Sequence, residues 1–142
     1  MFWEILLSHH SKNEYYKCFL LKIGKREIRI CARCFGFFLV FFFILGLFLI
    51  TKPTVNLLFY VFIIVVFALG YSDWILTRLG ATKSNNQYRL VSGMFLGIGG
   101  AALVYLVLNN YTNLVPYLIA VIFILIAFIV KSVSDKNKMK RS

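Results

Sequence analysis

The segment at residues 34–50, CFGFFLVFFFILGLFLI, decides the fold, because it is almost entirely apolar and contains no charged side chain. A bilayer core of about 30 Å is crossed by about 20 residues of α-helix. The segment is short for a span unless it begins earlier, near Ile30. Three further apolar segments follow, at about residues 55–76, 90–108 and 114–130. The sequence therefore predicts an all-α membrane protein with four transmembrane helices.

The composition excludes a water-soluble domain. The chain has 142 residues, of which 61% are hydrophobic and only 15% are charged, yet its formal net charge is +11. Soluble domains average about half apolar and about a quarter charged residues. In so apolar a chain, the excess of Lys and Arg indicates membrane topology and contact with lipid headgroups, and no nucleic-acid partner is expected.

The basic residues predict the orientation of the helices. The connections at residues 51–54, 77–89 and 109–113 are short, which makes neighbouring helices antiparallel. Of the sixteen Lys and Arg, all except Lys52 then fall on one side of the membrane. The positive-inside rule places that side in the cytoplasm. We therefore expect a multi-pass protein of the plasma membrane with both termini in the cytoplasm.

Three regions follow from this topology. Residues 1–33 form a cytoplasmic interfacial segment, residues 34–130 form the four-helix bundle, and residues 131–142 form a basic cytoplasmic tail. Residues 1–7 lack the basic n-region of a signal peptide, so we expect them to lie at the membrane interface through their aromatic side chains.

Cysteine and histidine residues gather at the start of the chain. These are His9, His10, Cys18, Cys31 and Cys34. The cytoplasm is reducing, which favours a metal site or a reactive thiol over a structural disulfide. A tetrahedral zinc ion needs four ligands, and this stretch offers five thiol and imidazole donors. The sequence predicts a metal site, with zinc as the expected ion and another transition metal as the alternative.

A β-hairpin would bring two of these thiols together. Gly24-Lys25 suits a two-residue turn with Gly at its first central position. In the register that this turn sets, Cys18 faces Cys31 and Cys34 follows shortly after. The remaining predicted pairs are Ile23 with Arg26, Lys22 with Glu27, Leu21 with Ile28, Leu20 with Arg29 and Phe19 with Ile30. This register puts the apolar side chains on one face and the cysteines on the other, so the two patterns agree.

Several interpretations of the cysteines stay open. The plainest is that they are small apolar residues near a membrane. The three cysteines with either His9 or His10 would close a structural zinc site. If both histidines bind and one cysteine does not, an open coordination position becomes possible, and with it catalysis. A redox dithiol of Cys31 and Cys34 ranks lower, because it leaves Cys18 and the histidines unexplained.

A polar group lies at the cytoplasmic end of the second segment and in the connection that follows. Asp73 is the only acid inside the four segments, and a carboxylate at membrane depth is costly unless it faces a partner or a watery cavity. We expect Arg89 to be its ion-pair partner, with Arg78 as the alternative.

This polar group has both a functional and a structural interpretation. Asp73 and Arg89 are candidate catalytic residues, and the candidates for binding an anion or headgroup are Lys83, Arg78 and Arg33. Structurally, the group would be an ion pair beside a helix capped by Ser84 or Asn85.

Small residues follow a four-residue spacing in the third segment, at Gly93, Gly97 and Ala101. That spacing lets another helix approach closely. Packing inside the bundle is favoured over a homo-oligomer seam at this face.

These elements resemble a family of small prokaryotic membrane proteins, domain of unknown function 2085, over about residues 8–100. The resemblance rests on CARCFG at residues 31–36 and on His9-His10, Asp73-Trp74, Ser84-Asn85-Asn86 and Arg89 ahead of a Gly-rich helix. That family typically has a Cys-His pair near its start, where this chain has Ser8 before His9, and Cys18 is a candidate replacement for the missing thiol. The resemblance supports the site and implies no activity.

Two functions from different classes fit these features. The first is a binding or accessory protein whose structural metal site presents basic residues to lipid headgroups or a protein partner. The second is a membrane-embedded metalloenzyme acting on a lipid or lipid-linked phosphate, with Asp73 as base or metal-orienting group and Arg89 and Lys83 as anion clamps. A metal or ion transporter ranks third, because Asp73 lies near a helix end and transporter sites lie near the midplane.

Overall fold

The computed structural model describes residues 18–23, 26–82 and 85–139 of the chain. In these ranges it contains a two-stranded hairpin and four helices, which are β1 (Cys18–Ile23), β2 (Arg26–Cys31), α2 (Ala32–Thr51), α3 (Leu57–Leu79), α4 (Asn86–Asn109) and α5 (Val115–Met139). All four helices are long and apolar enough to cross a membrane. The predicted four-helix membrane architecture is therefore confirmed.

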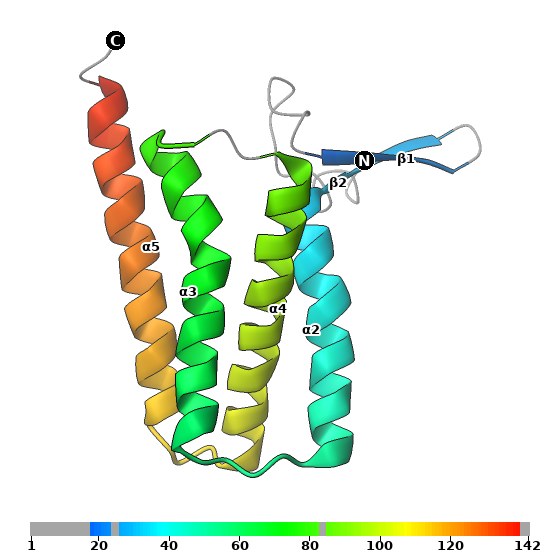
Figure 1. Cartoon of the computed structure of the whole chain (residues 1–142), viewed down its shortest axis with the longest axis vertical. Helices are drawn as coiled ribbons and strands as arrows, with labels where there is room; N and C mark the ends of the chain where they lie inside the picture. The colour runs from blue at the N-terminus through cyan, green and yellow to red at the C-terminus, as the bar shows by residue number, and fades with distance from the viewer. Residues whose placement is uncertain (1–17, 24–25, 83–84, 140–142) are drawn as a thin grey trace.

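The hairpin lies at one end of the bundle (Figure 1). The helices run alternately, so the same end holds the N-termini of α2 and α4 and the C-termini of α3 and α5. We call this end of the bundle the hairpin end. Lys52, in the connection between α2 and α3, lies at the opposite end.

Every helix extends beyond its predicted apolar segment at the hairpin end. The helix α2 begins two residues earlier than predicted and α4 begins four residues earlier, while α3 and α5 end three and nine residues later. At the opposite end the limits agree within two residues. The hairpin-end turns carry polar and charged side chains, which end an apolar run without ending a helix. Most of the predicted basic tail is therefore part of α5.

Helix ends follow the local signals. The side chain of Asn56 accepts a hydrogen bond from the Phe59 backbone N–H at 3.0 Å, and that of Asn85 accepts one from the Tyr88 N–H at 2.9 Å. Both are N-caps, and Asn85 is one of the two caps predicted for α4. Gly80 ends α3 in the left-handed region at a φ of 78°.

The central helix of the bundle is α4. In its most apolar stretch 44% of the residues are buried, against 6% in α2 and 11% in α5. The helix α4 packs most closely against α2 and then against α3. The apolar core on its other side consists of Ile63, Phe67, Ala102, Leu106 and Ile119. Most large apolar side chains of α2 and α5 are exposed, as expected of surfaces that face lipid.

The small residues of α4 form its contact with α2. A Cβ atom added to Gly97 would lie 2.5 Å from the carbonyl oxygen of Phe37, and one added to Gly93 would meet the backbone of Arg33. A step of four residues along α4, from Gly93 to Gly97, matches a step of four residues in the same direction along α2, from Arg33 to Phe37. The helices α2 and α4 are therefore parallel neighbours. Packing inside the bundle is thus the role of the predicted face of Gly93, Gly97 and Ala101. The contacts of Gly93 and Gly97 with α2 support packing inside the bundle, and a homo-oligomer through this face stays a prediction.

The hairpin has the predicted register at all six pairs of residues. Cys18 faces Cys31 at the base of the hairpin, and Ile23 faces Arg26 beside the turn. Because β2 ends at Cys31 and α2 begins at Ala32, the last rung of the hairpin is joined directly to the first turn of the bundle.

Candidate functional site at the hairpin end

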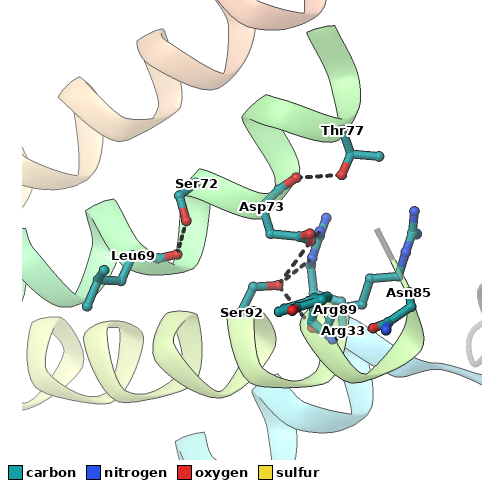
Figure 2. Close-up of polar contacts among 9 residues, drawn as sticks. Arg33, Leu69, Ser72, Asp73, Thr77, Asn85, Arg89 and Ser92 are labelled. Carbon is teal, nitrogen blue, oxygen red and sulfur yellow. Dashed lines mark hydrogen bonds and ion pairs between the residues drawn. The ribbon is translucent and has the colours of Figure 1, made fainter. Parts of the chain in front are cut away.

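A partly buried ion pair links α2 and α3 at the hairpin end. Arg33 is the second residue of α2, and its Nη2 donates a hydrogen bond to Oδ2 of Asp73 on α3. The same guanidinium donates from Nε to Oγ of Ser92 on α4 at 3.2 Å. The two charged side chains are 20% and 16% exposed. One arginine therefore joins three helices, as Figure 2 shows.

Ser92 occupies the centre of this group. It is 4% exposed, and its Oγ lies 3.5 Å from Oδ2 of Asp73 and 3.0 Å from the backbone carbonyl oxygen of Arg89. The hydroxyl of Thr77 donates to the backbone carbonyl of Asp73 at 2.6 Å, one turn along α3. The Asp73 carboxylate therefore faces a guanidinium and a hydroxyl group, which meets the requirement for an acid near the membrane.

The predicted ion-pair partner of Asp73 is wrong. Arg33 takes the place expected for Arg89, and the alternative, Arg78, lies 3.8 Å from Asp135 on α5 instead. The prediction relied on closeness along the chain between the end of α3 and the start of α4. The helix α4 packs against both α2 and α3. This packing brings the first turn of α2 close to Asp73 on α3.

Arg89 is buried without a counter-ion among the described residues. It is 7% exposed, and its Nε has no hydrogen-bond partner in that part of the chain. Arg78 also has an unbonded Nε, but its Nη2 faces the Asp135 carboxylate. Among the described residues, the group formed by Arg33, Asp73 and Arg89 therefore carries one surplus positive charge, and Arg89 is the member without an ion pair.

The three cysteines meet at the junction of hairpin and bundle. Cys18 and Cys31 are 9% and 4% exposed and face each other across the last rung. Cys34 lies in the first turn of α2, where its thiol is hydrogen-bonded to that of Cys31. The predicted pairing of Cys18 with Cys31, with Cys34 in the turn that follows, is therefore present.

The described residues contain no group of three or more His, Cys, Asp or Glu side chains arranged to hold a metal ion. Two of the predicted ligands, His9 and His10, lie outside the described residues, as does the predicted anion-binding Lys83. The metal site stays a prediction for these reasons.

Two features of the cluster were not apparent from the sequence. Ser92 is a single hydroxyl in an apolar helix and was not predicted as a site residue, yet its Oγ contacts both members of the ion pair. Arg33 was predicted to bind an anion or headgroup, and the structure pairs it with Asp73. The adjacent Gly93 could have indicated the role of Ser92, because a polar side chain beside a close helix contact can form a hydrogen bond to the neighbouring helix.

The four apolar helices, with a charged network and a thiol cluster at one end, define a small polytopic membrane protein. The model of a family described as predicted membrane protein DUF2085 matches residues 17–103, and the chain belongs to that family. The predicted resemblance is thereby confirmed. Comparisons with curated proteins and with solved structures found no match.

The matched range contains the hairpin, α2, α3 and most of α4. It therefore includes all three cysteines, the ion pair of Arg33 and Asp73, and also Arg89. The histidine pair and α5 lie outside it. The family description names a membrane location and no activity, so an assignment of function has to rest on the chemistry of the hairpin end.

Proposed function

We propose that this protein is a binding or accessory protein at the cytoplasmic face of the plasma membrane, and that a zinc ion fixes its hairpin to the bundle. The observation that supports the proposal is that Cys18 faces Cys31 where the hairpin joins α2, and that the thiol of Cys34 is hydrogen-bonded to that of Cys31. Isolated two-stranded hairpins are marginally stable in water, and a bound metal would stabilise this one.

The donor set suits zinc. Cys31 and Cys34 have the two-residue separation common in zinc knuckles, and Cys18 supplies a third thiolate from the facing strand. An imidazole of His9 or His10 would complete four ligands. Another transition metal is the alternative ion, since soft thiolate ligands also bind copper(I). When bound, the ion would act as a cross-link between β1, β2 and the first turn of α2.

A fixed hairpin would present the exposed side chains of β1 to a partner. Leu20 and Lys22 of β1 are exposed, and Lys22 adds to the basic character of this end of the chain. With the termini in the cytoplasm, such a surface would meet anionic headgroups or a protein at the membrane. The orientation rests on the fifteen to one distribution of basic residues about the four helices.

The metalloenzyme alternative has less support. A general base needs a free lone pair directed at its substrate, and the Oδ2 atom of Asp73 is engaged by Arg33 and lies close to Ser92. The transporter alternative ranks lower still, because Asp73 lies toward the hairpin end of α3.

Elemental analysis of the purified chain tests the zinc proposal. We expect stoichiometric zinc in the wild type and its loss in Cys34→Ser and Cys18→Ser, with His9→Asn and His10→Asn identifying the fourth ligand. A redox dithiol would instead show no stoichiometric metal and a Cys31–Cys34 disulfide after mild oxidation. Wild-type protein without metal, or Cys34→Ser with unchanged metal, would contradict the proposal.

A further inference from the structure

Two helix N-termini lie side by side at the hairpin end. The helices α2 and α4 are parallel, and the backbone of Arg33 lies against Gly93 in the second turn of α4. Each helix N-terminus carries about half a unit of positive charge and exposes backbone N–H groups. Neither first turn contains an acid to balance that charge. The pair of termini therefore forms a region of positive potential.

Both first turns also contain an arginine, although cations are disfavoured at helix N-termini. Arg33 is the second residue of α2, and Arg89 is the fourth residue of α4. Asp73 neutralises Arg33 through a direct ion pair. Arg89 is 7% exposed, has an unbonded Nε and forms no ion pair within the described residues. A buried and unpaired guanidinium is costly unless an anion accompanies it.

We propose that the hairpin end contains an anion site for a phosphate group, formed by Arg89 together with the N-terminal turns of α2 and α4. The planar fork of a guanidinium matches phosphate oxygens, and helix N-termini favour phosphate through their N–H groups and their dipole. The site lies where the helices continue past their apolar segments, at the level of lipid headgroups. The phosphate belongs either to a phospholipid headgroup or to a soluble phosphate, which share this chemistry. The site does not depend on the zinc proposal.

Thermal unfolding in uncharged detergent, with inorganic phosphate as the probe, tests the site. A ligand that binds only the folded protein raises the melting temperature as its concentration increases. We expect phosphate to stabilise the wild type and Arg89→Gln to weaken its affinity by roughly tenfold or more, because a charge-assisted bidentate contact is lost. Lys136→Gln is the matched control, since it removes an exposed cation at the same end and should leave phosphate binding unchanged.

A second variant is expected to bind phosphate more tightly than the wild type, which distinguishes a real effect on the site from poor folding. In Asp73→Asn the Arg33 guanidinium loses its counter-ion, so the surplus charge of the group rises from one to two. We expect phosphate to bind this variant several-fold more tightly than it binds the wild type, a result that misfolding cannot produce. A wild type that phosphate does not stabilise, or an Arg89→Gln variant that binds as well as the wild type, would overturn the proposal.

A second arm identifies the source of the phosphate. The chain is reconstituted in vesicles of phosphatidylcholine alone and in vesicles that also contain phosphatidic acid, and the phosphate titration is repeated. If the ligand is a lipid headgroup, phosphatidic acid stabilises the wild type more than Arg89→Gln and removes the response to added phosphate. If the ligand is soluble, the response to phosphate is the same in both vesicles. A response to phosphatidic acid that is equal in wild type and Arg89→Gln reflects general surface charge and contradicts the site.

Discussion

The most connected side chain at the hairpin end is Arg33, which bonds to α3 and α4 from the first turn of α2. Near a membrane few water molecules compete for such bonds, so an unsatisfied partner is costly. The sequence marked Asp73 as an acid that needs a partner and favoured Arg89, across the short connection to the next helix, with Arg78 as the alternative. The correct partner is 40 residues away in sequence, and only the packing of whole helices brings the two together.

Removing both members of this ion pair should cost less stability than the two single substitutions added together. We expect Arg33→Gln and Asp73→Asn each to lower the free energy of unfolding by about 2–3 kcal/mol, because each leaves a partly buried charge unpaired. The double variant should lose less than the sum of the two, by about 1–2 kcal/mol. Reversible unfolding of the four proteins in mixed micelles gives the coupling energy directly. Additive losses would show that the pair contributes no specific interaction.

At the scale of the elements, local patterns were predictable and contacts between elements were not. The register that faces Cys18 with Cys31 follows from one turn and a two-residue alternation, and all six pairs were predicted correctly. Helix limits at the hairpin end were wrong because hydropathy marks where the apolar run stops, whereas α4 begins at its Asn85 cap. The sequence did not predict which helix packs against the Gly93 face, because small residues allow a close contact but do not specify the partner helix.

The close contact of α2 and α4 predicts a sharp difference between two glycines. Gly97→Ala should lower stability by about 1–3 kcal/mol, because the new methyl group meets the Phe37 carbonyl and the helices must separate. Gly46 on α2 has no atom within 4 Å of an added Cβ, so Gly46→Ala is the matched control and should be neutral or slightly stabilising. Unfolding in micelles and protease resistance measure both variants. Equal stability of the two would mean that α2 and α4 do not touch at Gly97.

At the scale of the whole molecule, the two ends of the bundle differ in chemistry. The hairpin end holds the three cysteines, the ion pair and Arg89, and the connections at the opposite end contain Lys52 as their only basic residue within the described chain. Polar contacts at that opposite end are neutral, such as Asn113 Nδ2 donating to the Tyr60 hydroxyl at 2.9 Å. Both the zinc proposal and the phosphate proposal therefore concern a single face of the membrane, and the orientation of the chain decides which compartment supplies the ligands.

That orientation is itself testable with reporter fusions. Basic residues near helix ends are retained in the cytoplasm, and fifteen of the sixteen lie on the side of the hairpin. A green fluorescent protein joined after Ser142 should therefore fluoresce, whereas alkaline phosphatase, which is active only outside the cytoplasm, should be active when inserted at residues 110–113 and inactive when joined after Ser142. Arginines introduced at Thr54 and Thr112 should not invert the protein, because they change the ratio of basic residues only from fifteen to one to fifteen to three. An active alkaline phosphatase after Ser142 would place the thiols in an oxidising compartment, where a disulfide competes with zinc, and would reverse the predicted topology.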